Sequence, residues 1–389
     1  MTYVSGPYNS GQLLRSIHEV EMGLTERVLR EGPEIGDSGE RKSWRDRVLE
    51  ASQGRNTVLY DDKNYPSIMV EFPFITRDGA ISGMGSDAHP AFIVDGSLKS
   101  IIYVSKYINV VEGSGVDARA MSLRYKDPTA SINFDNSLAA CQQKGEGWHL
   151  NTNATWAAIA LQAWKKGFLC RGNNNYGSDH TASHETAIAS RPDVTSIART
   201  LTGSGPPSWS HDGTPFGVYD LNGNVREWVG GLRLNEGEIN IIPDNDAALY
   251  DADHGASSTL WKAMLEDGTF VDPGETNTLK IDCEEPGGSG DLFIKTGSGT
   301  NLDAGTSANT MFADLTSAAS VPDIIKLLAL FPDDATIPTG RVYARSGERL
   351  AFRGGHWTNG SIAGLFCLYL SSTRSDTSSH LGFRSAFVL

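Results

Sequence analysis

Acidic side chains and glycines gather in one turn-rich segment, DGTPFGVYDLNGNVREWVGG, which runs from Asp212 to Gly231. Asp220 and Glu227 supply carboxylates, and the glycines between them leave backbone carbonyls free to turn inward. Carboxylate and carbonyl oxygens are the ligands that a hard cation such as Ca²⁺ prefers. The pattern indicates a candidate calcium loop. The alternative is an Asx turn in which Glu227 accepts hydrogen bonds from backbone amides.

Other patterns with chemical potential are weaker. His180 and His184 stand four residues apart in DHTASHE, but the order is not HExxH and the context is rich in Asn and Gly. A solvated loop is therefore favoured over a metal site. The stretch GDSGERKS at 36–43 has Arg41 where a phosphate-binding loop needs its second glycine, which argues against nucleotide binding. The sequence has no GxSxG motif, so no pattern in it indicates a serine hydrolase of this type.

Composition narrows the class of protein. The chain has 389 residues, 42 of them glycine, and a formal net charge of −14. A charge of this sign argues against a general nucleic-acid or anionic-membrane binder, and the sequence has no apolar run long enough to insert in a membrane. The first residues do not resemble a secretory signal. The four cysteines are widely separated, which predicts reduced, buried thiols rather than a zinc ribbon.

The elements that must position these residues begin with a helical region over residues 1–64. Leu13, Ile17, Val20 and Leu24 share one helical face, and Glu19 and Glu21 fall on other faces. Gly and Pro at 32–39 interrupt the pattern, and a second helix is expected over about 41–52. We expect a helical hairpin that packs on the main domain. An attachment or oligomerisation module is the alternative, because a narrow apolar stripe also suits an inter-chain seam.

Residues 65–389 read as one α+β domain. Short β-like runs at 67–74, 91–94 and 101–108 alternate with turn residues, and one clear helix follows at 153–166, capped by Thr152 or Asn153. Residues 230–345 are rich in Gly, Ser, Thr and Asp and are interpreted as an insertion with one short apolar helix near 321–331. The chain then finishes with a compact β-like segment at 351–389.

Two segments carry a family resemblance. The loop Gly223-Asn224-Val225-Arg226-Glu227-Trp228 and the end of the chain, with Arg353-Gly354-Gly355-His356-Trp357, Arg374-Ser375 and Gly382-Phe383-Arg384, resemble the formylglycine-generating-enzyme branch of the C-type-lectin-like fold. The helix entry from Gly147 to Ala157 is similar to that family's as well. The resemblance implies a C-type-lectin-like fold of this subtype from about residue 66 onward.

The same resemblance bears on metals. The family's calcium positions fall on Asp220, Gly223, Val225 and Glu227, which implies a structural Ca²⁺ held by two carboxylates and two backbone carbonyls. The enzymes also bind copper through two cysteines five residues apart before the Arg-Ser element. Here those positions are Phe366 and Ser371, so the oxidase activity is not expected to carry over.

The end of the chain also resembles the variable region of target proteins of diversity-generating retroelements. In that family a reverse transcriptase rewrites adenines in asparagine-type codons, which reach many residue types but not Lys, Glu, Gln, Met or Trp. Residues 353–389 contain no Lys, Glu, Gln or Met, and their single Trp357 stands at a framework position. The resemblance implies a diversified surface on a fixed frame.

Alternation separates the frame from the contact positions. Phe366, Leu368 and Leu370 are expected to point inward on a strand, so Cys367, Tyr369 and Ser371 are expected to point outward. By resemblance the contact set extends to His356, Thr358, Asn359, Ile362, Ser372, Asp376, Ser378, Ser379 and His380. Tyr369 and the two histidines are the expected anchors, because aromatic groups add contact area at low entropy cost.

These observations predict a non-enzymatic protein that binds a variable macromolecular ligand, such as a host or environmental cell-surface protein or glycan. Residence on a virion or cell surface is expected, and oligomerisation stays open. The alternatives are a metal oxidase of the formylglycine-generating type, or a virion structural protein with a degenerate lectin-like domain. No cofactor beyond the structural Ca²⁺ is expected.

Overall fold

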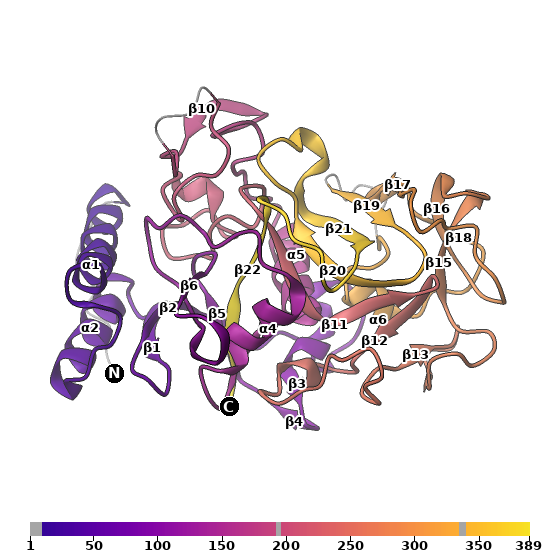
Figure 1. The fold of residues 1–389 in the computed structure, drawn as a ribbon, viewed down its shortest axis with the longest axis horizontal. Helices are drawn as coiled ribbons and strands as arrows, with labels where there is room; N and C mark the ends of the chain where they lie inside the picture. The colour runs from indigo at the N-terminus through magenta and orange to yellow at the C-terminus, as the bar shows by residue number, and fades with distance from the viewer. Residues whose placement is uncertain (1–9, 192–195, 334–339) are drawn as a thin grey trace.

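The computed structural model describes residues 10–191, 196–333 and 340–389, with side chains from residue 15 onward. Two large sheets, four two-stranded sheets and a small number of helices make up the described part of the chain, so the α+β class is confirmed. Helices α1 and α2 stand at one end of the molecule, and the strands of residues 238–317 lie at the other, as Figure 1 shows. The end of the chain runs between them.

The two N-terminal helices lie where the helical period predicts them. Helix α1 spans Ser10–Glu31, and α2 spans Ser38–Ala51. Ile17 and Leu24 of the predicted apolar face are fully buried and Val20 is half-buried, whereas the side chain of Leu13 lies outside the described part. The GDSG stretch is a helix start rather than a phosphate loop, because the Asp37 carboxylate accepts a hydrogen bond from the Glu40 amide.

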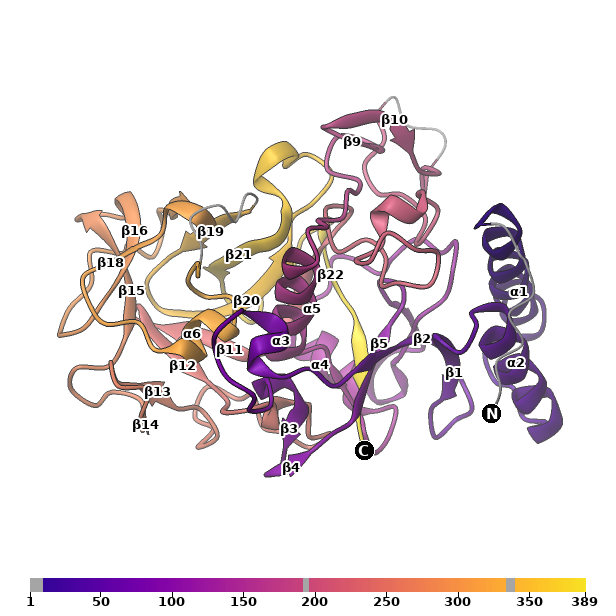
Figure 2. The same cartoon turned by 180° about the vertical axis from the view of Figure 1, so that it is seen from behind.

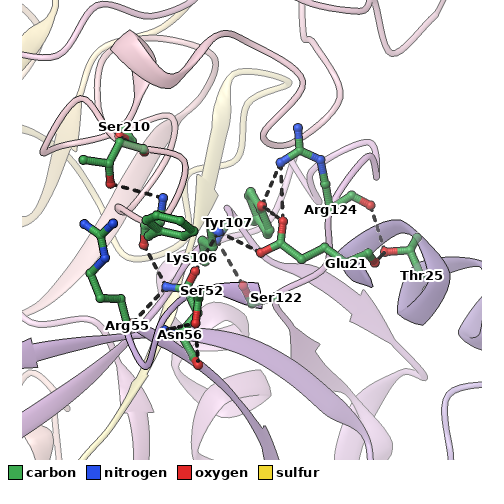
Figure 3. A network of polar contacts seen from close by, with 12 residues as sticks. Glu21, Thr25, Ser52, Arg55, Asn56, Lys106, Tyr107, Ser122, Arg124 and Ser210 are labelled. Atoms are coloured by element: carbon green, nitrogen blue, oxygen red, sulfur yellow. Dashed lines mark hydrogen bonds and ion pairs between the residues drawn. The ribbon is translucent and has the colours of Figure 1, made fainter. Parts of the chain in front are cut away.

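Glu21 is expected on a helical face other than that of Ile17 and Leu24, but it is buried with them and anchors α1 to the main domain. Its carboxylate is fully buried and accepts hydrogen bonds from Lys106 Nζ at 2.7 Å and from the Tyr107 hydroxyl at 2.7 Å. Arg124 Nη1 lies 3.5 Å from the same carboxylate (Figure 3). Without α1, Lys106 and Arg124 would be left without the carboxylate that balances their charge, and unpaired buried charges are costly. The ion cluster therefore favours the docked position of α1.

The smaller sheet contains the first strands and the last one. Its order is β1 (Asn56–Tyr60), β2 (Pro66–Pro73), β5 (Ile101–Ser105), β23 (Ser385–Phe387) and β8 (Trp148–Leu150). The final strand therefore lies inside the sheet, hydrogen-bonded on both sides. This arrangement closes the end of the chain onto its beginning.

The larger sheet holds the two motif segments. Its order is β17 (Ala308–Met311), β19 (Arg341–Ala344), β21 (Gly364–Ser372), β20 (Glu348–Gly354), β11 (Arg226–Asn235), β12 (Glu238–Ile241), β15 (Lys280–Glu285), β16 (Ser289–Lys295) and β18 (Thr316–Ser317). The short strand β22 (Leu381–Phe383) pairs in parallel with β11. Residues 230–345 thus extend this sheet rather than loop out from it.

Helices α5 and α6 lie on one face of this large sheet, as the reverse view in Figure 2 shows. Helix α5 (Asn153–Lys165) packs on β11 and on α6 (Asp323–Leu327). The Thr152 hydroxyl caps α5 by accepting from the Thr155 amide at 3.1 Å. The expected helices at 153–166 and near 321–331 are therefore both present.

The remaining elements are short and connect the sheets. The helices are α3 (Arg77–Ala80) and α4 (Phe134–Gln142). Two-strand pairs are formed by β3 (Ile93–Val94) with β4 (Ser97–Leu98), β6 (Val110–Glu112) with β7 (Arg119–Met121), β9 (Ser178–Asp179) with β10 (Ala182–Thr186), and β13 (Ala263–Met264) with β14 (Phe270–Val271). No helix in the described ranges is long and apolar enough to cross a membrane.

Candidate ligand-binding face

The two motif segments meet in a buried ion pair. Arg384 Nε and Nη2 each lie 2.6 Å from a different oxygen of Glu227, and both side chains are almost fully buried. The same guanidinium donates to the carbonyls of Ser105 at 2.8 Å and Tyr219 at 2.9 Å. Arg384 therefore links the Glu-Trp loop to the smaller sheet and to the Asp220 loop.

The two carboxylates of the predicted calcium set already have protein partners, although Asp220 Oδ1 is buried without a hydrogen-bond partner among the described residues. Both Glu227 oxygens accept hydrogen bonds from Arg384, whose positive charge balances that carboxylate. Asp220 Oδ2 accepts from the Gly203 amide at 2.9 Å, and burial raises the pKa of this carboxyl to about 6. In the described part of the chain, no three His, Cys, Asp or Glu residues are grouped to hold a metal ion. Gly223 is instead held by packing, because a Cβ there would meet the Asn173 carbonyl oxygen at 2.1 Å.

The predicted frame of residues 353–389 is buried. Arg353 is inaccessible and donates to Asn153 Oδ1 at 2.6 Å and to the Ala329 carbonyl at 3.1 Å. Arg374 is half-buried and donates to Glu348 at 2.8 Å and to Asp135 at 2.8 Å. The other frame residues are buried apart from Trp357, which is half-buried. The arginines of the motifs therefore tie this segment to remote parts of the fold.

Strand β21 contradicts the expected alternation. Cys367 is fully buried and Tyr369 is 4% exposed, so the expectation that these two side chains point to solvent is wrong. They pack in a second apolar cluster with Trp228 and Phe352, while Phe366 and Leu368 face the main core. The strand is therefore covered on both faces, as the run LFCLYL fits better than an alternating pattern.

The remaining contact positions divide by exposure. Thr358, Asp376 and Ser379 are exposed, and the half-buried positions are Asn359, Ile362, Ser371, Ser372, Ser378 and His380. His356 is 9% exposed and stacks on His380 with ring centroids 4.3 Å apart. Burial, with Arg226 nearby, lowers the pKa of His356 to about 2 and that of His380 to about 4, so both imidazoles are neutral at pH 7.

Two features of this face are not apparent from the sequence. Trp357 and Ser379 line a hollow of about 410 Å³, together with Ser131 and Arg199. The loop before β9 also joins the face, because the Tyr176 amide donates to the Trp357 carbonyl at 2.8 Å and the Gly360 amide donates to Asn174 O at 2.9 Å. The asparagines and glycines of that loop predict only a turn, so the sequence does not indicate that the loop lies next to residues 353–389. The candidate face therefore includes residues far outside 353–389.

The predicted copper positions carry no thiolate. Phe366 packs on Phe312 with ring centroids 5.2 Å apart, and Ser371 lies near the end of β21. Burial raises the pKa of the nearby Cys367 thiol to about 11, so it stays protonated at neutral pH. His180 and His184 are exposed on the β9–β10 hairpin, as expected for a solvated loop.

Comparisons with known proteins give similar structures but no sequence family. No family model matches the sequence, and no characterised protein matches it. A variable protein 1 of Treponema denticola is similar at 11% identity and a TM-score of 0.31, over 85% of this chain and 98% of that one. PvdO of Pseudomonas aeruginosa is similar at 14% identity and a TM-score of 0.33, over 86% of this chain and 98% of that one. A Major Tropism Determinant P3c variant is similar at 11% identity and a TM-score of 0.31, over 82% of this chain and 63% of that one.

Proposed function

We propose that this chain is a non-enzymatic ligand-binding protein whose segment 353–389 displays a diversified surface on a C-type-lectin-like scaffold. One observation carries the proposal: the segment divides into a buried frame and an exposed set with no common chemistry. Arg353, Arg374 and Arg384 hold the frame through contacts to remote residues. The side chains of exposed positions such as Thr358, Asp376 and Ser379 make only local contacts, such as that of Asp376 with Thr373, and should tolerate replacement.

The ligand in this proposal is a macromolecule, either a protein or a glycan of a host or environmental cell surface. The chain would sit on a virion or cell surface, where such a ligand is met. The contact set consists of His356, Thr358, Asn359, Ile362, Ser371, Ser372, Asp376, Ser378, Ser379 and His380. Cys367 and the expected anchor Tyr369 are left out, because side chains that are 0% and 4% exposed cannot contact a ligand in this conformation.

Sequencing of the coding DNA tests the proposal. We expect a near-copy of the 3′ coding end beside a reverse transcriptase gene, differing from it mainly at adenines. Across isolates, codons for the exposed contact positions should differ and those for Arg353, Arg374 and Arg384 should not. Isolates that show no clustering of differences at the contact positions would refute a diversified surface.

Folding of engineered variants gives an independent check. Ser379→Asn changes an exposed position and should leave the melting temperature unchanged within error. Cys367→Asn places a polar amide in the apolar cluster beside Trp228 and should destabilise the fold by several kcal/mol, because buried polar groups without partners are costly. Equal melting temperatures for both variants would show that the frame and the contact set are not distinct.

The oxidase alternative makes a different prediction. It requires stoichiometric copper binding and oxygen consumption with a thiol substrate, through thiolates at the positions of Phe366 and Ser371. A single protonated thiol at Cys367 does not supply the pair of ligands. Copper binding by the purified protein would therefore favour the enzyme over the binding protein.

A further inference from the structure

Arg226 lies beneath the contact set although it belongs to the Glu-Trp loop. Its guanidinium carbon stands 3.9 Å from the centroid of the Tyr369 ring, and its Nη2 donates to the Tyr369 hydroxyl at 2.9 Å. Its backbone amide donates to the His380 carbonyl at 2.9 Å. Tyr369 is in turn stacked between Tyr343, at 4.3 Å, and Phe352, at 4.8 Å. The position of this cation is therefore fixed by packing.

The charge of Arg226 is not balanced by a carboxylate in the described part of the chain. Several half-buried or buried arginines have one, as Arg384 does with Glu227 and Arg199 with Asp127. Others, such as Arg77, Arg341 and Arg345, have none among the described residues. Arg226 differs from these in its position next to His380 of the contact set. Arg226 Nε is buried without a hydrogen-bond partner among the described residues. Arg353 also lacks a carboxylate, but it is fully buried against carbonyl oxygens, where no ligand reaches it.

The surroundings do not supply negative charge either. His356 and His380 are neutral at pH 7, because burial, together with the nearby charge of Arg226, lowers the pKa of each. The acidic residues of the chain are concentrated elsewhere: residues 230–345 hold 19 Asp and Glu against 7 Lys and Arg. In a chain with a net charge of −14, the guanidinium of Arg226 thus has no carboxylate partner among the residues that the structure describes.

We propose that Arg226 is a fixed anchor for a carboxylate of the bound ligand, an Asp or Glu side chain of a partner protein. This inference rests on the proposed function and names the chemistry of its ligand. A guanidinium recognises a carboxylate through charge-assisted hydrogen bonds, which are stronger where aromatic side chains limit water. Because Arg226 lies outside 353–389, diversification leaves it in place. Every variant of the surface therefore presents the same cation, and the variable side chains select what surrounds the acidic group.

A titration with model peptides tests the anchor. The probes are a capped acidic peptide, acetyl-(Gly-Glu)₄-amide, and its neutral match, acetyl-(Gly-Gln)₄-amide, at low ionic strength. The readout is the shift of the His356 and His380 ring signals in protein labelled with ¹³C-histidine, which reports contact at this face. We expect the acidic peptide to shift both signals and the neutral peptide to shift neither.

Variants assign the effect to the guanidinium. Arg226→Gln should weaken binding of the acidic peptide about tenfold or more, because a charge-assisted contact is lost. Arg226→Lys keeps the charge without the fork and should fall between the two. Arg30→Gln removes the same charge from the exposed face of α1 and is the matched control, with binding unchanged. Thermal melting checks that each variant is folded.

Three results would overturn the anchor: equal affinity in Arg226→Gln and the wild type, equal shifts with the neutral peptide, or no shift with the acidic peptide at about 10 mM. None of them bears on the DNA test of diversification. Failure of the anchor is therefore distinguishable from failure of the proposed function.

Discussion

Replacing Arg384 by methionine tests whether the buried ion pair holds the two motif segments together. The substitution keeps an unbranched side chain but leaves the Glu227 carboxylate, 1% exposed, without its counterion. It also removes the donors to the Ser105 and Tyr219 carbonyls. Breaking a buried ion pair by deleting one partner costs about 3–5 kcal/mol. We therefore expect Arg384→Met to lower the free energy of unfolding by about 4 kcal/mol.

The expected shift in melting temperature follows from the size of the chain. An unfolding entropy of about 2.1 cal/mol/K per residue gives about 0.8 kcal/mol/K for 389 residues. A loss of about 4 kcal/mol then lowers the melting temperature by about 5 °C. Circular dichroism or calorimetry measures this shift directly. Arg30→Met, at an exposed pair with Glu31, is the matched control and should change the temperature very little.

The double variant Glu227→Met/Arg384→Met separates the ion pair from general packing. If the single change is costly because it strands a charge, removing both charges should recover part of the stability. Single and double variants whose effects simply add would refute the coupling. A melting temperature of Arg384→Met within error of the wild type would refute the argument as a whole.

Three further predictions concern the docking of α1, the effect of low pH on stability, and calcium binding. Glu21→Ala leaves Lys106 and Arg124 without their buried counterion and should speed amide exchange and proteolysis over residues 15–31. Glu19→Ala, at an exposed position of the same helix, should not, and equal exchange in both variants would contradict the anchoring role of Glu21. The free energy of unfolding should fall by several kcal/mol as the pH drops from 6.5 toward 4. Burial lowers the pKa of four buried histidines to about 4, so the unfolded chain binds more protons than the folded chain in this range. Asp220, whose pKa is raised by burial, opposes this loss in part, and a melting temperature that stays constant down to pH 5 would contradict the effect. The histidines are His89, His149, His211 and His254. CaCl₂ or EDTA should leave the melting temperature unchanged, whereas a bound ion at a hundredfold excess over its Kd would add about 2.7 kcal/mol.

Local patterns predicted the helices and the frame. The stripe of Ile17 and Leu24 located α1, and the clustered apolar residues around Trp156 located α5. The motif arginines were placed in the frame by resemblance, and the structure buries Arg353 and Arg384 completely. The helices could be predicted because each depends on a short stretch of chain, whereas the remote contacts of the arginines could not be derived from local pattern.

Features that depend on distant partners could not be predicted. Glu21 looks like a surface acid, since its partners Lys106 and Arg124 lie 85 and 103 residues away. The run around Cys367 was interpreted as alternating, yet it is apolar throughout, and a strand buried on both faces requires a second layer that the sequence does not reveal. Arg226 could not be assigned to the binding face, because only the folded sheet places it under Tyr369.

The position of β23 has a consequence for how the gene can change. Residues 385–387 form an inner strand of the smaller sheet, and they are translated after every codon of the contact set. A stop codon or a shifted reading frame introduced in the contact positions would therefore remove the strand that joins β5 to β8. Such a chain lacks the Arg384 pair as well and would be cleared as unfolded protein. Under the proposed diversification, only changes that keep the reading frame leave β23 in place, so the fold limits which changes in residues 353–389 yield a folded chain.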